Sequence, residues 1–244
     1  MTKKSLLLAV VLTLVTASLS FADPVPPSKG QWAYPLEQYL QLHKRADENS
    51  TGREISMPQK WINVPSATRD KNNFLWYKVN VDGQSGWLPQ NGIRLKMGGK
   101  SKSASNIYKH YAKARRRVMD RPRDWSERNE GGLTTYTTDG GIIRVFSGKN
   151  GTEDLYFRTD RFDICSKMLG VDLIDMSQPE VRAKLGTPTI RETPYDEPDL
   201  NILSYELPDR NMTLAVIERR YDGDTEGTVI SVELYRGRPG ERDD

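Results

Sequence analysis

A strand, a tight turn and a returning strand can be read between residues 75 and 89. Leu, Tyr, Val and Val alternate there with Trp, Lys and Asn, which is the two-residue period of a strand with two distinct faces. Asp82-Gly83 follows and favours a type I′ hairpin, because both central positions need a positive φ. Pro89 belongs at a strand end. The sequence therefore predicts a β-hairpin at the centre of a compact β domain over 31–97.

This hairpin and the strand after it resemble a bacterial SH3-type domain over residues 55–96. The residues that carry the resemblance are Trp76-Tyr77-Lys78-Val79, Gly86-Trp87-Leu88 and Asn91-Gly92-Ile93-Arg94-Leu95. SH3-type domains often bind Pro-rich or peptidoglycan peptides on aromatic surfaces, so the resemblance implies a ligand-binding role for Trp76, Tyr77 and Trp87. Alternation lets only one of Trp76 and Tyr77 face inward. The other ring either lines a groove or packs under the Trp32 segment or against the second half of the chain.

A complete helix signature occupies residues 175–188. Ser177 and Glu180 form a capping box, and Pro179 lies in the first turn, where its missing N–H costs little. Gly186 is the expected left-handed terminator, and Pro188 prevents the helix from resuming. Three strands are predicted after it, over 203–207, 213–218 and 228–235.

The helix motif Met-Ser-x-x-Glu-Val-x-x-x-Leu-Gly-x-Pro and the strands after it, over 173–234, are similar to small outer-membrane-assembly lipoproteins typified by BamE (the BamE/SmpA family). Members of that family are typically lipid-anchored parts of a barrel-assembly complex, whereas this chain has no cysteine at the expected processing point. The resemblance implies a helix packed on an antiparallel meander. We therefore expect an α+β fold: a small SH3-like β-barrel followed by an α+β domain over 133–235 with an antiparallel meander.

The first 22 residues have the layout of a secretory signal peptide. Lys3 and Lys4 give a cationic start, an apolar run covers 6–15, and a small-x-small pattern ends at Ala22. The run is shorter than the roughly 20 apolar residues of a membrane span. We expect cleavage after Ala22 and export to the periplasm or the medium, with no membrane-spanning segment left. An uncleaved N-terminal anchor is the alternative.

The charge of the exported chain is nearly balanced. Of 36 basic residues Lys3 and Lys4 leave with the signal, so 34 face 33 acidic ones. This balance gives no global drive toward nucleic acid or anionic lipid, and export also argues against nucleic acid. Any anionic partner would have to use a local patch.

One such patch is predicted in the basic linker 98–132. A helix in this linker would carry an apolar stripe made by Ile107, Tyr111, Ala114 and Val118. The basic side chains that fall mostly outside the stripe are Lys109, Lys113, Arg116 and Arg117. They are either a patch for wall polymer, lipid head groups or an acidic protein, or the solvated face of a helix docked on the core. We favour the solvated face, because amphipathic surface helices are common. The charged tail 236–244 is expected to be disordered.

Few residues could support catalysis. Cys165 is the only cysteine, which excludes an internal disulfide, and its apolar surroundings predict a buried, inert thiol. His43 and His110 lie in no metal-ligand or catalytic motif, so we expect both on the surface. The acidic loop 222–227 has carboxylates at calcium-like spacing, but a strand follows where an EF-hand needs its last ligand, and a hairpin loop is favoured. We expect no metal and no cofactor.

These observations predict an exported, non-catalytic binding or scaffold protein of the bacterial cell envelope. Its SH3-like module would contact a cell-envelope protein or a peptidoglycan peptide. The alternative is a cell-wall hydrolase or another envelope enzyme. Wall hydrolases with SH3-type modules normally carry a recognisable Cys/His or His/Asp domain, and the sequence shows no such motif.

Overall fold

The computed structural model describes residues 31–72, 74–99, 102–148, 151–207, 210–221 and 227–239. Strands hold 49% of the described residues and helices 18%. The predicted α+β class is therefore wrong: the protein is mainly β, with two antiparallel sheets and three helices in the described ranges. The predicted meander does not form the sheet of a separate domain, because its strands continue on both sides into a much larger sheet.

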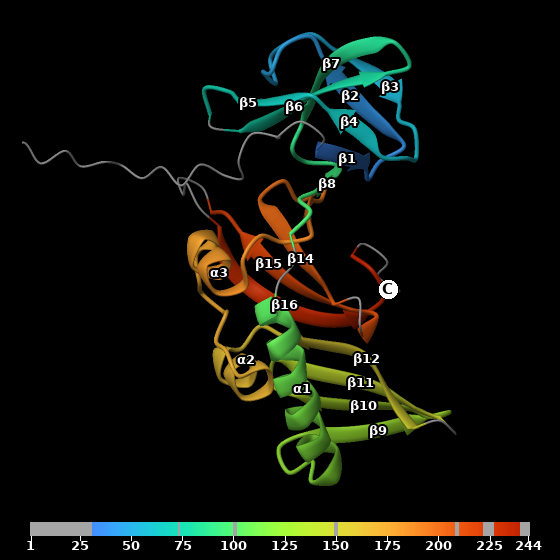
Figure 1. Ribbon diagram of the computed structural model, residues 1–244, viewed down its shortest axis with the longest axis vertical. Coiled ribbons are helices and arrows are strands. Elements are labelled where there is room, and N and C mark those ends of the chain that lie inside the picture. Colours follow the sequence, from blue (N-terminus) through green and yellow to red (C-terminus); the bar gives the residue numbers. More distant parts are fainter. Residues whose placement is uncertain are drawn as a thin grey trace, which may run out of the picture.

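The first body, at the top of Figure 1, is built from short strands: β1 Gln31–Pro35, β2 Tyr39–His43, β3 Gly52–Ser56, β4 Ile62–Val64, β5 Ser66–Arg69, β6 Leu75–Val81, β7 Gln84–Pro89 and β8 Ile93–Lys96. Asp82 and Gly83 join β6 to β7 with φ values of 49° and 81°. The predicted type I′ turn is thereby confirmed, since both central residues have a positive φ.

The second body contains three helices and longer strands. Its elements are α1 Lys102–Asp120, β9 Ser126–Glu130, β10 Leu133–Thr138, β11 Gly141–Gly148, β12 Gly151–Thr159, α2 Phe162–Leu169, α3 Gln178–Leu185, β13 Ile190–Thr193, β14 Leu200–Leu207, β15 Met212–Arg219 and β16 Thr228–Arg236. α3 begins after the predicted capping box of Ser177 and Glu180 and ends at Gly186, which has a φ of 80°. The predicted start and end of this helix are confirmed in position, but the ψ of Gly186 is −161°, outside the left-handed helical region that was predicted for it.

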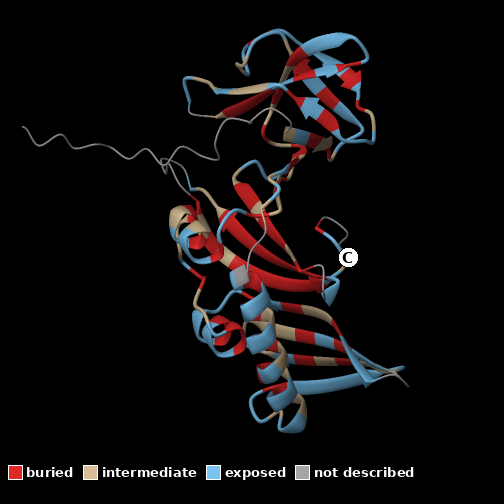
Figure 2. Cartoon of the chain, viewed as in Figure 1, coloured by how far each residue is buried: buried red, intermediate tan, exposed pale blue. Residues whose placement is uncertain are grey.

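The strands form one sheet of 11 in the order β4-β1-β8-β13-β14-β15-β16-β12-β11-β10-β9, and one sheet of five in the order β3-β2-β7-β6-β5. The three helices cover one face of the larger sheet in the second body (Figure 1). The central strands β14, β15 and β16 are buried along most of their length (Figure 2). Alternate residues, such as Leu203, Tyr205 and Leu207, belong to the core that the helices share. A separate core, with Ala33, Val64 and Leu88 fully buried, fills the space between the two sheets of the first body.

The larger sheet runs from one body into the other. β8 pairs with β13 in antiparallel register, from Ile93 opposite Thr193 to Lys96 opposite Ile190. The chain after β8 stays attached, since Met97 N donates to Thr189 O at 2.9 Å. The two bodies are therefore joined by main-chain hydrogen bonds and not only by a linker.

A buried polar cluster lies beside this junction. Arg191 is 3% exposed, and its Nε and Nη2 donate to Asn201 Oδ1 at 3.1 and 2.6 Å. Thr193 donates its hydroxyl to the same oxygen at 3.0 Å, and Arg191 Nη2 lies 3.5 Å from Gln90 Oε1 in the first body. A cation thus replaces apolar packing where the two cores meet.

Several predicted segments lie outside the described residues: the signal peptide 1–22, the tail from 240 onward and residues 222–226 of the acidic loop. In the described part of the chain, no helix has both the length and the apolarity that crossing a membrane requires.

Candidate functional site

Two of the three aromatic residues predicted to bind a ligand are buried. Tyr77 is 2% exposed and belongs to the core of the first body. Trp76, on the opposite face of β6, is 1% exposed. Its ring packs edge-on against His43 and Phe74, with ring centroids 5.0 and 6.3 Å away. Neither Trp76 nor Tyr77 therefore presents a ring on the surface, and only Trp87, which is half-buried, remains partly open.

The outer face of β6 is covered because Asp70 organises the loop before it. Asp70 Oδ1 accepts hydrogen bonds from the main-chain N–H groups of Asn72 and Phe74, both at 2.9 Å. Its Oδ2 accepts from Trp76 Nε1 at 3.0 Å. His43 completes the cover, with Nδ1 3.1 Å from the Ser50 carbonyl oxygen. The expectation of a solvent-facing histidine was wrong for this half-buried residue, whereas His110 is exposed.

A different group of aromatic rings is exposed on the first body. Trp32 and Trp61 are 41% and 36% exposed, and the Trp61 ring meets Tyr34 edge-on at 5.6 Å. The Arg94 guanidinium lies 5.7 Å from the centre of the Tyr34 ring. We refer to Trp32, Tyr34 and Trp61 as the aromatic face. The spacing of Trp32 and Tyr34 in the sequence could have predicted this face, because residues two apart on a strand lie on the same side.

The predicted basic patch lies on α1 as a row of separate, exposed side chains. The predicted apolar stripe is confirmed, because Ile107, Tyr111, Ala114 and Val118 are all buried. The predicted patch residues Lys109, Lys113, Arg116 and Arg117 are all exposed. Of these four, Arg117 alone lines a pocket that α1 forms with α2.

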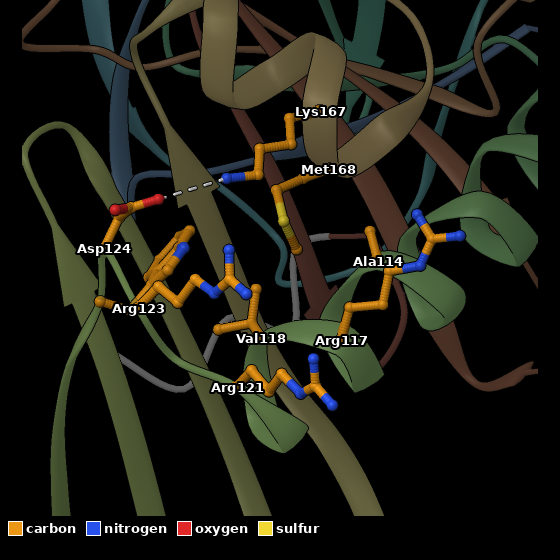
Figure 3. Close-up of a pocket in the computed structure, with 9 residues that line it drawn as sticks. Ala114, Arg117, Val118, Arg121, Arg123, Asp124, Lys167 and Met168 are labelled. Atoms are coloured by element: carbon orange, nitrogen blue, oxygen red, sulfur yellow. Dashed lines mark ion pairs between the residues drawn. The ribbon is translucent and has the colours of Figure 1, made fainter.

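That pocket, of about 250 Å³, lies at the C-terminal end of α1 beside α2, and we call it the α1–α2 pocket (Figure 3). Its floor is apolar and buried, made by Ala114, Val118, Trp125 and Met168. Its rim is cationic and exposed, made by Arg117, Arg121, Arg123 and Lys167. The pocket thus combines apolar contact area with positive charge in one concave site.

The local chain path explains how these side chains come together. Pro122 follows the end of α1, and Trp125 N donates to Pro122 O at 2.5 Å in a tight turn. The turn carries Trp125 into the core, where it is 8% exposed, and leaves Arg123 at the rim. From the other side, α2 supplies Met168 to the floor and the preceding residue, Lys167, to the rim (Figure 3).

The positive charge of the rim is only slightly compensated. Asp124 is the one carboxylate lining the pocket, and its Oδ2 lies 3.8 Å from Lys167 Nζ. Within the described ranges no ion pair involves Arg117, Arg121 or Arg123. The negative end of the α1 dipole favours cations here, but that effect is confined to the last turn. It accounts for Arg117 and not for Arg121, Arg123 and Lys167, which lie outside α1.

Among the pocket residues, the sequence predicted Ala114 and Val118 only as part of the buried stripe, and Arg117 as the one candidate binding residue. The available signal was the run Arg121-Pro122-Arg123-Asp124-Trp125, in which a proline, a tryptophan and two arginines follow a basic helix. The contribution of Lys167 and Met168 had no local signal, because it depends on how α2 packs against α1.

A buried carboxylate on the sheet contacts two side chains of α1. Asp154, on β12, is 9% exposed; its Oδ1 lies 2.8 Å from Arg115 Nε, and its Oδ2 accepts from the Tyr108 hydroxyl at 2.9 Å. Burial, with Asp154 nearby, raises the pKa of Tyr108 to about 12. This cluster attaches α1 to the sheet. Elsewhere in the described residues, no group of three or more His, Cys, Asp or Glu side chains is placed to hold a metal ion.

Cys165 is buried as predicted, with 0% exposure, and its Sγ lies 3.4 Å from the Val171 carbonyl oxygen. Burial raises the pKa of this thiol from 9.0 to about 11. We expect native protein at pH 8 to react with a thiol reagent at least about 100-fold more slowly than urea-unfolded protein, because the thiolate is the reactive form. Absorbance with a disulfide reagent measures both rates.

The raised pKa of Cys165 also determines how this thiol makes the stability of the protein depend on pH. Between pH 9 and 11 the unfolded thiol ionises before the folded one, so this thiol makes stability fall as the pH rises. Rapid labelling of the folded protein at pH 8 would contradict the buried state of Cys165.

Comparison with known proteins gave no match: no family model, no curated protein and no solved structure matches this chain. The resemblances to SH3-type domains and to BamE-like lipoproteins therefore stay predictions.

Proposed function

We propose that this protein is an exported, non-catalytic binding or scaffold protein of the bacterial cell envelope, which holds an anionic partner in the α1–α2 pocket. The observation that carries the proposal is the pocket itself, where four cations and one carboxylate surround a buried apolar floor. Support for export comes from the signal-like pattern of residues 1–22.

The energies of these contacts indicate what kind of binding to expect. Exposed ion pairs are worth about 0.2–1 kcal/mol each, so the rim alone gives weak, salt-sensitive attraction. Burying one apolar side chain on the floor would add about 1.5–3 kcal/mol. The pocket therefore favours a ligand that carries both negative charge and an apolar group over a simple anion.

The aromatic face gives the first body a contact surface of its own. Its exposed tryptophans, Trp32 and Trp61, are set on or beside strands whose alternate residues are buried. We propose that the predicted contact with a cell-wall ligand is made here, with Trp87 as a separate contact, instead of through Trp76 and Tyr77. Exposed aromatic side chains of this kind are enriched at recognition surfaces.

Photocrosslinking in the living envelope tests the proposal. A photoreactive amino acid would replace Arg121 in the pocket, Trp61 on the aromatic face or, as a control, exposed Lys184 on α3. We expect adducts with envelope components at Arg121 and Trp61, little adduct at Lys184, and a mature protein that begins at Asp23 by mass spectrometry. Cytoplasmic protein with an intact N-terminus, or no adduct at either site, would contradict it.

A further inference from the structure

The α1–α2 pocket has two chemically different parts, and a ligand that used only one would leave the other without a role. The floor of Val118, Trp125 and Met168 is buried and apolar, so it offers no charged group to a ligand, whereas the arginines of the rim are exposed. We infer, on the basis of the proposed binding function, that the occupant is an acidic peptide segment of a partner protein. One apolar side chain enters the pocket, and flanking carboxylates meet the rim.

The size of the pocket favours a single side chain. Its volume is about 250 Å³, below the 300–1,000 Å³ typical of pockets that enclose a whole small molecule. At about 30 Å³ per water molecule, the space corresponds to about eight waters, which is enough for one apolar side chain as large as phenylalanine and leaves no room for a second. A free phosphate ion would leave the floor uncovered, and a lipid acyl chain would extend beyond it.

The composition of the rim favours carboxylates. Three of its four cations are arginines, whose planar guanidinium groups bind carboxylates through two parallel hydrogen bonds. Arg117 comes from the last turn of α1, Arg121 and Arg123 come from the following loop, and Lys167 comes from α2. The cations therefore surround the mouth of the pocket from several elements. This arrangement suits a peptide that has acidic residues on both sides of its apolar side chain. Buried anchors surrounded by polar contacts are the usual arrangement of binding hot spots.

Fluorescence polarisation with the mature chain tests this occupant. The probe is a labelled seven-residue peptide with a central leucine and two acidic residues on each side. Matched peptides replace the leucine by alanine, or the acids by their amides. We expect Arg121→Glu and Arg123→Glu each to weaken binding at least tenfold, and we expect the alanine and amide peptides to bind at least tenfold more weakly to the unchanged protein.

Lys109→Glu and Lys113→Glu are matched controls, because they make the same charge change on α1 outside the pocket. They should alter affinity less than threefold. An equal loss in the controls would show general charge attraction, and an unchanged affinity of the alanine peptide would show that the floor is not used; either result overturns the proposal. Binding of phosphatidylglycerol vesicles or inorganic phosphate that depends on Arg121, without binding of the peptide, would also overturn it.

Failure of this inference is distinguishable from failure of the proposed function. If the photoreactive residue at Arg121 captures a wall polymer or lipid, the binding function stands and the peptide occupant is wrong. If it captures nothing, both lose their support. Circular dichroism and thermal unfolding verify that the exposed arginine variants are folded.

Discussion

Replacing Arg191 by methionine should lower the free energy of unfolding by about 3 kcal/mol, because hydrogen bonds of a buried charged group are lost and their acceptor stays behind. Arg191 is 3% exposed and donates twice to Asn201 Oδ1, so its removal leaves that buried oxygen with the Thr193 hydroxyl as its remaining side-chain donor in the described residues. Urea unfolding of the mature chain, followed by tryptophan fluorescence, measures the change.

One effect acts in the opposite direction. The charge of Arg191, second to burial, helps to lower the pKa of Arg69 and of Arg182, so its removal relieves some repulsion. We expect the lost hydrogen bonds to dominate, since both are buried and one is only 2.6 Å long. Arg94→Met is the control: Arg94 pairs with Glu192 at 2.8 Å but is more exposed, and we expect a loss below about 1 kcal/mol. Equal losses for the two variants would show that burial at the junction is not what matters.

The second large effect is expected for Gly99→Ala, with a loss of about 3 kcal/mol or a protein that fails to accumulate. A Cβ at Gly99 would collide with the carbonyl oxygens of Thr187 and Pro188. These are main-chain atoms, and they are held in place because Gly99 N donates to Pro188 O at 3.1 Å. Relief of the clash would require separating the two strands of chain at the junction. Thermal unfolding of the purified variant measures the loss.

The neighbouring glycine provides the matched control. Gly98 has a φ of 71° but open space around its Cβ position. Gly98→Ala should therefore cost only the strain of a left-handed alanine, about 1–2 kcal/mol. If Gly98→Ala proved as damaging as Gly99→Ala, the close approach of 99 to 187–188 would not be the cause.

The sequence predicted those elements whose chemistry is local. The Asp82-Gly83 turn and the Ser177 capping box were predicted correctly, because a positive φ and a side-chain cap depend on adjacent residues. The fold class was predicted wrongly because the sheet is assembled from distant strands. β8 and β13 pair although nearly a hundred residues separate them in the sequence. β16, the last strand of the predicted meander, pairs with β12, which precedes the meander in the sequence.

The candidate site residues also divide into features that depend on adjacent residues and features that depend on distant ones. Alternation placed Trp76 and Tyr77 on opposite faces of a strand, but it carried no information about the Asp70 loop and His43 that cover Trp76. The exposed cations of α1 followed from its helical period, whereas the pocket depends on how Lys167 and Met168 of α2 meet the end of α1. Periodicity indicates which way a side chain points and not what lies opposite it.

The continuous pairing of β8 with β13 also determines how the molecule transmits movement. Two domains on a peptide tether tumble independently, whereas here a shared hydrogen-bonded ladder resists bending between Trp61 at one end and Arg121 at the other. Under the proposed function, partners bound at these two places would be kept at a constant separation. A force applied to one partner would act on the other through the shared sheet.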